Sequence, residues 1–223
     1  MGMGLLYAER AVLEGAKAVV LWDRNAEALE AAAQRLRGLG SSAVLPYTLD
    51  VSSAAEVAEK AEAVLAELGA PDVLINNAGI VRGKYFWEHS GTDIDAVMDV
   101  NTLAPMHITR AFLPGMIERR TPARILNVAS ASGTLSVPKM SVYTASKWAV
   151  IGWSDSLRLE LEEAGHGHVQ VTTLIPSYIK TGMFEGARGP LMTPLMEPEY
   201  VVDKAWKALL DGKARVQLPW TVP

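Results

Sequence analysis

The 223-residue chain contains no cysteine, and this absence removes several kinds of site at once. Disulfides, thiolate zinc sites and cysteine nucleophiles all need a thiol, so none of them can form. A reducing compartment suits this composition, and we expect a cytoplasmic protein. An excess of positive charge is absent as well: the formal net charge is −4, which argues against a nucleic-acid partner.

Long hydrophobic runs are also missing. The uncharged apolar runs are short, such as residues 18–22, whereas about 20 apolar residues are needed to cross a bilayer. The sequence therefore predicts no transmembrane segment. Hydrophobic residues still make up 49% of the chain, which is sufficient for one large core and predicts a single domain over residues 1–223.

Strand-like apolar runs alternate with helix-like segments along the chain. Strands are expected at residues 17–22, 43–49, 73–76, 124–129, 169–175 and 215–218, and helices at 5–14, 26–37, 54–68, 94–119, 141–164 and 198–210. Because the strands are apolar on both faces, the pattern predicts a parallel sheet covered by helices on each side, a doubly wound, Rossmann-like α/β fold. Residues 177–197 hold several glycines and prolines and are expected to form a lid-like loop.

Polar or backbone-shaping residues follow five of these strands, at the edge of the sheet where doubly wound folds bind ligands. They are Asp23, Asp50, Asn76 with Asn77 and Gly79, Ser130, and Pro176 with Ser177. Each residue alone is a weak signal, but together they predict a site at the carboxyl ends of the strands.

The first residues could hold a dinucleotide. Gly2 and Gly4, with Met3 between them, would let the backbone approach a pyrophosphate at a helix N-terminus, although a flexible chain end is the alternative. Asp23, at the end of the next strand, could bind the ribose 2′-hydroxyl of NAD and repel the 2′-phosphate of NADP. Arg24 could accept that phosphate, and a solvated turn is a further alternative; NAD is expected over NADP.

Tyr143 and Lys147 lie one turn apart on a predicted helix and so share a face. A nearby cation favours the phenolate and lowers the pKa of a tyrosine, which could then act as a general base on an alcohol. Tyr200 and Lys204 have the same spacing, but no polar strand end precedes them, and we interpret them as a surface pair. His166 and His168 have no third ligand nearby in sequence, so no metal is expected.

The order and spacing of these residues resemble the short-chain dehydrogenase/reductase family over nearly the whole chain. The matching positions are Asp50-Val51, Asn76-Asn77-Ala78-Gly79, Asn101, Ser130, Tyr143-Thr144-Ala145-Ser146-Lys147, and Pro176 with Thr181. A weaker likeness, in residues 176–184 and 194–202, is to the branch that acts on retinol, 17β-hydroxysteroids and other lipophilic alcohols. The resemblance implies an NAD(P)-dependent oxidoreductase that interconverts a secondary or lipophilic alcohol and its ketone or aldehyde.

The resemblance also implies residue roles. Tyr143 would be the general acid/base, and Lys147 would bind the nicotinamide ribose and lower the Tyr143 pKa. Ser130 would hydrogen-bond the substrate oxygen, and Asn101 would hold a water that links Lys147 to solvent. The other implied cofactor contacts are Gly2, Met3, Gly4, Asp23, Arg24, Asp50, Val51, Asn77, Ala78, Gly79, Pro176, Ile179 and Thr181. Ser132, Met183 and Phe184 would join Ser130 and Tyr143 around the substrate.

Two departures from the family pattern stand out. Ser177 replaces the usual glycine after Pro176, which would narrow or polarise the nicotinamide end. The family's first strand and most of its glycine-rich turn are missing, so the functional polypeptide is expected to begin roughly 15 residues earlier. Without that strand, unpaired buried backbone groups would each cost about 1–3 kcal/mol.

Two other functions remain as alternatives. A catalytically inactive nucleotide-binding or scaffolding protein would fit the missing strand but not the intact Asn101, Ser130, Tyr143 and Lys147. A sugar-nucleotide epimerase or dehydratase would need a larger C-terminal substrate domain. The helices expected near 94–119 and 141–164 resemble the family's dimer interface and predict a homodimer or homotetramer.

Overall fold

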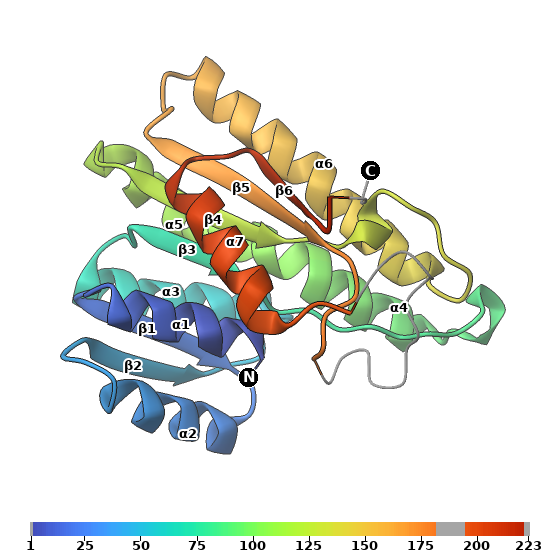
Figure 1. Cartoon of the computed structure of the whole chain (residues 1–223), viewed down its shortest axis with the longest axis horizontal. Helices are drawn as coiled ribbons and strands as arrows, with labels where there is room; N and C mark the ends of the chain where they lie inside the picture. The colour runs from blue at the N-terminus through green and yellow to red at the C-terminus, as the bar shows by residue number, and fades with distance from the viewer. Residues whose placement is uncertain (1, 182–194, 221–223) are drawn as a thin grey trace.

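The computed structural model of the chain describes residues 2–181 and 195–220, and its strands and helices alternate as expected (Figure 1). The strands are β1 (Ala18–Asp23), β2 (Ala43–Thr48), β3 (Val73–Asn76), β4 (Ala123–Val128), β5 (Val169–Pro176) and β6 (Arg215–Leu218). The α-helices are α1 (Met3–Leu13), α2 (Ala26–Arg37), α3 (Ala54–Leu68), α4 (Gly91–Met98), α5 (Ala104–Arg119), α6 (Ser141–Glu163) and α7 (Pro198–Leu210). Met183 and Phe184, with most of the expected lid, lie outside the described residues.

All strand pairs are parallel, as predicted, but the strands do not form one continuous sheet. One sheet has the order β3-β4-β5-β6, and β1 pairs with β2 in a second. The break falls between β1 and β3, the position where the resemblance places the family's first strand. Among the described residues no strand bridges these two edges, so each lacks a hydrogen-bonding neighbour on one side.

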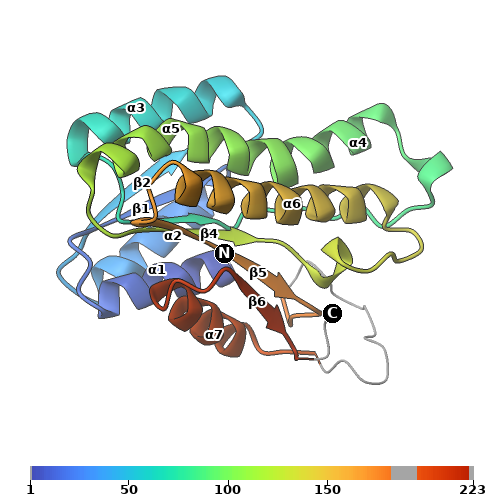
Figure 2. The ribbon, with the colours of Figure 1, turned by 90° about the horizontal axis from the view of Figure 1, so that it is seen from above.

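Helices cover both faces of the sheets (Figure 2). Helices α3, α5 and α6 pack on one face, around a core that includes Val64, Phe112 and Ile125. Helices α1 and α7 pack on the opposite face around Tyr7 and Leu174. This double cover explains why the strands are apolar along their whole length.

Local sequence sets several helix boundaries. Asn25 and Ser53 begin α2 and α3 by accepting hydrogen bonds from the backbone N–H of Ala28 and Glu56, respectively. Gly69 ends α3 with φ +78°, a conformation that favours glycine.

The helix expected over 94–119 is interrupted. Between α4 and α5 the chain forms a π-helical turn, η2 (Asp99–Leu103), which contains the buried Asn101. A π-turn inserts one residue into the helical repeat, and such turns are frequent at functional sites. Periodicity over the whole segment averages out one inserted residue, which is why the sequence predicted a single helix.

Candidate active site

The candidate site lies at the carboxyl ends of the strands, where the polar residues were expected. A cavity of about 390 Å³ opens there. Side chains and backbone from the start of α1 and from the segments after β3, β4 and β5 line it, together with the first turns of α6: Gly2, Met3, Asn77, Gly79, Val128, Ala129, Ser130, Tyr143, Lys147, Pro176, Ser177, Ile179 and Thr181. Positions far apart in the sequence are thus brought to one place.

Ser130 and Tyr143 form a hydrogen-bonded pair inside this cavity. Ser130 follows β4, and its hydroxyl accepts a hydrogen bond from the backbone N–H of Ser132, 3.2 Å away. Tyr143 lies in the first turn of α6 and is only 3% exposed. The structure therefore brings together the two residues for which the resemblance implied roles at the substrate oxygen, and Ser132 lies beside Ser130.

Lys147 lies under Tyr143 on the same face of α6. Its ammonium is buried, donates a 2.9 Å hydrogen bond to the backbone carbonyl of Val128, and stands 5.8 Å from the centroid of the Tyr143 ring. Burial lowers the pKa of Lys147 to about 8, because a dry site disfavours the charged form.

The expected lowering of the Tyr143 pKa is not found. Burial raises the pKa of Tyr143, and the hydrogen bond with Ser130 opposes that rise only in part. A phenolate loses more from desolvation here than it gains from the serine, so the prediction based on the lysine alone was wrong. Tyr143 is thus protonated at neutral pH in the chain alone.

Asn101 holds three segments together. Its side-chain oxygen accepts from the backbone N–H of Ile80 at 2.8 Å, and its amide nitrogen donates to the Ile80 carbonyl at 2.9 Å and to the Ser146 hydroxyl at 3.0 Å. Both amide hydrogens are therefore committed to protein atoms. The expectation that Asn101 holds a water stays a prediction.

The segment after β3 fits a dinucleotide. The side-chain oxygen of Asn77 is buried without a hydrogen-bond partner, and this residue lines the cavity beside Gly2 and Met3. A Cβ on Gly4 would meet the Asn77 amide nitrogen at 3.0 Å, so any other residue at position 4 would push the Asn77 side chain from its present place. The unpaired Asn77 oxygen is an acceptor, so a ribose hydroxyl could donate to it, while a phosphate would instead be attracted by the N–H groups at the start of α1.

The remaining expected cofactor contacts divide into two groups. Gly79, Pro176, Ile179 and Thr181 line the cavity, and the Gly79 backbone passes close to Lys147: a Cβ there would lie 3.6 Å from the lysine ammonium. Asp23, Arg24, Asp50, Val51 and Ala78 do not line it. Asp23 accepts a hydrogen bond from the backbone N–H of Asn25, and Asp50 accepts from Ser52, whose hydrogen bonds lower the Asp50 pKa.

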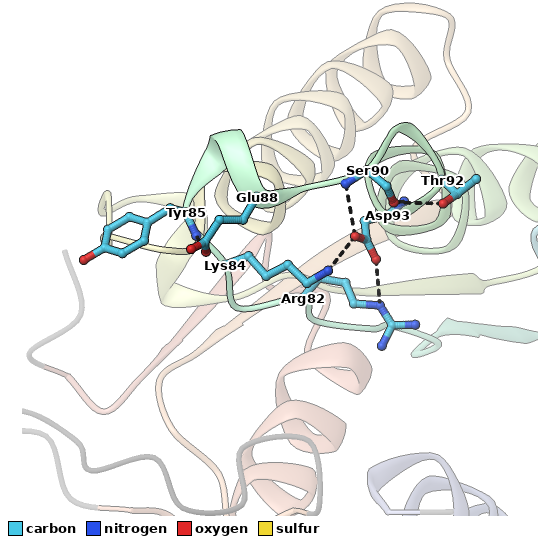
Figure 3. Close-up of polar contacts among 7 residues, drawn as sticks. All are labelled: Arg82, Lys84, Tyr85, Glu88, Ser90, Thr92 and Asp93. Carbon is cyan, nitrogen blue, oxygen red and sulfur yellow. Dashed lines mark hydrogen bonds and ion pairs between the residues drawn. The ribbon is translucent and has the colours of Figure 1, made fainter.

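A network that the sequence predictions did not include orders the segment between β3 and α4 (Figure 3). Asp93 accepts a 2.7 Å hydrogen bond from the Lys84 ammonium, pairs with Arg82 at 3.8 Å, and accepts from the backbone of Ser90. These contacts lower the Asp93 pKa to about 2, with the Lys84 bond as the largest cause. The spacing of Ser90 and Asp93 could have predicted part of this network, because the two residues form a capping box at the start of α4.

Residues 2–181 and 195–220 contain neither a cluster of metal ligands nor a membrane-spanning helix. No group of three or more His, Asp or Glu side chains there could hold a metal ion. No helix in that part of the chain is long and apolar enough to span a membrane. The rings of His166 and His168 stand edge to face, 6.1 Å apart.

Comparisons with known proteins find similar sequences over nearly the whole chain. Residues 1–190 match the family model described as short chain dehydrogenase. The chain is 36% identical to "Epidermal retinol dehydrogenase 2" of Mus musculus over 220 residues, which cover 98% of this chain and 71% of the relative. It is 33% identical to "Estradiol 17-beta-dehydrogenase 11" of Homo sapiens over 204 residues, covering 92% and 67%.

Solved structures match over almost the whole chain. A short-chain dehydrogenase/reductase from Burkholderia phymatum in complex with NAD superposes with a TM-score of 0.88 at 29% identity, covering 97% of this chain and 84% of that one. A short-chain dehydrogenase from Sphingobium yanoikuyae in complex with NADPH gives 0.87 at 29% identity, covering 99% and 85%.

Proposed function

This chain belongs to the short-chain dehydrogenase/reductase family of NAD(P)-dependent oxidoreductases, and we propose that Ser130, Tyr143 and Lys147 carry its reaction on a lipophilic secondary or primary alcohol. The observation that carries the proposal is the hydrogen-bonded Ser130–Tyr143 pair, with the buried Lys147 ammonium 5.8 Å from the centroid of the Tyr143 ring. The relatives are named as dehydrogenases, and the alternative of an inactive scaffold has no support among them.

The residues divide the work of alcohol oxidation. A nicotinamide dinucleotide, held by residues that line the cavity such as Asn77 and Thr181, would supply the hydride acceptor for the carbinol carbon. Tyr143 takes the hydroxyl proton, and Ser130 donates a hydrogen bond to the substrate oxygen as charge develops on it. Lys147, whose ammonium lies 5.8 Å from the centroid of the Tyr143 ring, would bind the nicotinamide ribose and offset part of the charge that develops on Tyr143 during the reaction. Reduction of the carbonyl reverses each transfer, with Tyr143 returning its proton.

NAD is the proposed cofactor over NADP. Asp23 ends β1 at the edge of the sheet where the adenosine ribose would lie, and a carboxylate there binds a 2′-hydroxyl but repels a 2′-phosphate. Among similar structures, one holds NAD and another NADPH, so fold alone does not decide the preference. Fluorescence titration with NADH and NADPH tests this preference. Asp23→Ala should reduce the ratio by which NADH binds more tightly than NADPH. A wild type that binds NADPH more tightly than NADH contradicts the proposal.

The proposed substrates are lipophilic alcohols such as retinol and 17β-hydroxysteroids. The support is the names of the relatives, one a retinol dehydrogenase and one an estradiol dehydrogenase. Ile179 and Met196, which pair in a short β-bridge, give one end of the lid segment an apolar character. We propose Met183 and Phe184, which lie outside the described residues, as further apolar contacts of the substrate.

A homodimer or homotetramer in the cytoplasm is the proposed assembly. Large apolar side chains on the expected interface helices lie on the surface, since Trp148 is 52% and Leu159 54% exposed. Sedimentation velocity tests the assembly, and Trp148→Glu should shift a dimer toward monomer. A wild type that sediments as a monomer would remove this part of the proposal.

The experiment for the activity follows nicotinamide absorbance during turnover of purified protein. NAD and NADP are run in parallel against secondary alcohols, steroids and retinol, with Tyr143→Phe as the control. Reduction of cofactor that disappears in the variant supports the proposal. Cofactor binding without turnover of any substrate favours the inactive nucleotide-binding alternative.

A further inference from the structure

One hydroxyl inside the site has no part in the chemistry described above, although it contacts two of the residues that do. Ser146 precedes Lys147 on α6 and is fully buried. Its hydroxyl donates a 2.7 Å hydrogen bond to the backbone carbonyl of Tyr143 and accepts a 3.0 Å hydrogen bond from the side-chain amide of Asn101. This single side chain therefore joins the π-helical turn to the first turns of α6.

Asn101 in turn connects Ser146 to a third segment of the chain. The same Asn101 amide binds both the N–H and the carbonyl of Ile80, in the segment that follows β3. A second bond ties the same elements, since the Thr102 hydroxyl donates to the Ser146 carbonyl at 3.2 Å. Asn101 thus holds three segments that line or adjoin the cavity, and the Ser146 hydroxyl is the side-chain group through which it reaches α6.

The side chain at position 146 must accept a hydrogen bond from the Asn101 amide and donate one to the Tyr143 carbonyl, and a hydroxyl can do both. The Asn101 amide needs an acceptor, and the Tyr143 carbonyl receives a donor, so one buried group must do both. Alanine would leave an Asn101 amide hydrogen unpaired in a dry environment, and the nearest way to satisfy it is a shift of η2 relative to α6. Such a shift moves Tyr143 and Lys147 with respect to Ser130, which is fixed separately to the end of β4.

We propose that Ser146 is a positioning residue for the reaction: by bridging Asn101 and the Tyr143 backbone, it sets the reach of Tyr143 to Ser130 and to the substrate oxygen. The proposal rests on the function proposed above for Tyr143. A displacement of the order of 1 Å at a reacting group costs up to about 100-fold in rate, so a fixed backbone here matters to catalysis.

The same helix provides a matched control two turns further along. Ser154 is also buried; its hydroxyl donates to the Val150 carbonyl at 2.6 Å and accepts from the Asn127 amide at 2.9 Å. The chemistry is therefore the same, a serine bridging a backbone carbonyl and an asparagine amide. Asn127 pairs onward with Asn76 in the core, so Ser154 makes no contact with Tyr143 or Asn101.

The experiment compares Ser146→Ala with Ser154→Ala. Both variants should lose similar stability in urea unfolding, because each removes one equivalent bridge. Ser146→Ala should lower kcat for alcohol oxidation by about 10- to 100-fold, with KM changed less than threefold. Ser154→Ala should keep kcat within about threefold of the wild type. Equal losses of kcat in the two variants, or none in Ser146→Ala, overturn the proposal.

A second readout does not depend on turnover. The absorbance titration of Tyr143, taken as the difference between each protein and its Tyr143→Phe counterpart, reports how well the tyrosine contacts its partners. Ser146→Ala should shift this titration to higher pH, and Ser154→Ala should not. If the wild type turns over no substrate, the proposed function fails, and this titration still decides the role of Ser146: an unshifted curve overturns it.

Discussion

The Lys147 ammonium donates its 2.9 Å hydrogen bond to the backbone carbonyl of Val128, and in the described part of the chain no carboxylate forms an ion pair with it. A buried cation held only by a neutral carbonyl is costly, which agrees with the lowered Lys147 pKa of about 8. The proposed reaction uses a charged Lys147, whereas burial in this fold disfavours that charge.

We expect Lys147→Met to abolish turnover and yet to stabilise the protein without cofactor at neutral pH. The folded-state pKa of Lys147 lies near 8, below the ordinary value of 10.5, so protonation favours unfolding throughout the range below 8. The penalty, of the order of 3 kcal/mol, is relieved as the pH rises from 8 to 10.5. Urea unfolding of the wild type and of Lys147→Met at several pH values measures this penalty. If the difference between their free energies of unfolding does not shrink as the pH rises, the prediction is wrong.

The raised pKa of Tyr143 predicts opposite pH profiles for the two directions. Alcohol oxidation needs Tyr143 as a base and should accelerate as the pH rises, whereas carbonyl reduction needs its proton and should stay level until the pH passes the raised Tyr143 pKa and slow beyond it. Tyr143→Phe should lower kcat in both directions by about 10²- to 10⁴-fold. Initial rates across the pH range provide the measurement, and parallel profiles in the two directions would rule out Tyr143 as the shared acid/base.

Two glycines near α6 should respond oppositely to alanine. A Cβ on Gly133 would lie 2.6 Å from Ile151 Cδ1 and 2.8 Å from the backbone carbonyl of Lys147, so Gly133→Ala should cost about 1–3 kcal/mol and reduce activity. Gly152, within α6, has open space at the same position, and Gly152→Ala should be neutral or stabilise by up to about 1 kcal/mol. The free energies of unfolding of the two variants measure this difference. Equal effects would contradict the close contacts at Gly133 and the open space at Gly152.

The break between the two sheets should be visible in amide hydrogen exchange. β4 is paired on both sides, whereas β1 and β3 each have one unpaired edge in the described residues. Along a parallel strand, alternate residues point their N–H groups to opposite sides, so about half of the β3 amides face the break. These should exchange much faster than those of Ile125 and Leu126; mass spectrometry of short peptides measures this, and uniform protection across β3 and β4 would argue against an open edge.

Much of the local structure could be predicted because it depends on near neighbours. The helix over α3 follows from Ser53 as a cap, apolar spacing and Gly69, all within one stretch of sequence. The parallel sheet class follows from strands that are apolar on both faces. The π-helical turn around Asn101 was missed, because one inserted residue barely changes the average periodicity of a long helix.

By itself, the sequence determined the family and the α/β class, and it predicted Asn101, Ser130, Tyr143 and Lys147 as site residues, since all of these depend on residue type and spacing. Only the tertiary structure decided that burial outweighs the favourable contacts of Tyr143 and raises its pKa, that Lys147 turns to the Val128 carbonyl, and that Ser146 bridges Asn101 to Tyr143. Burial and hydrogen-bond partners depend on which distant segments pack together, and spacing along the chain carries no record of that.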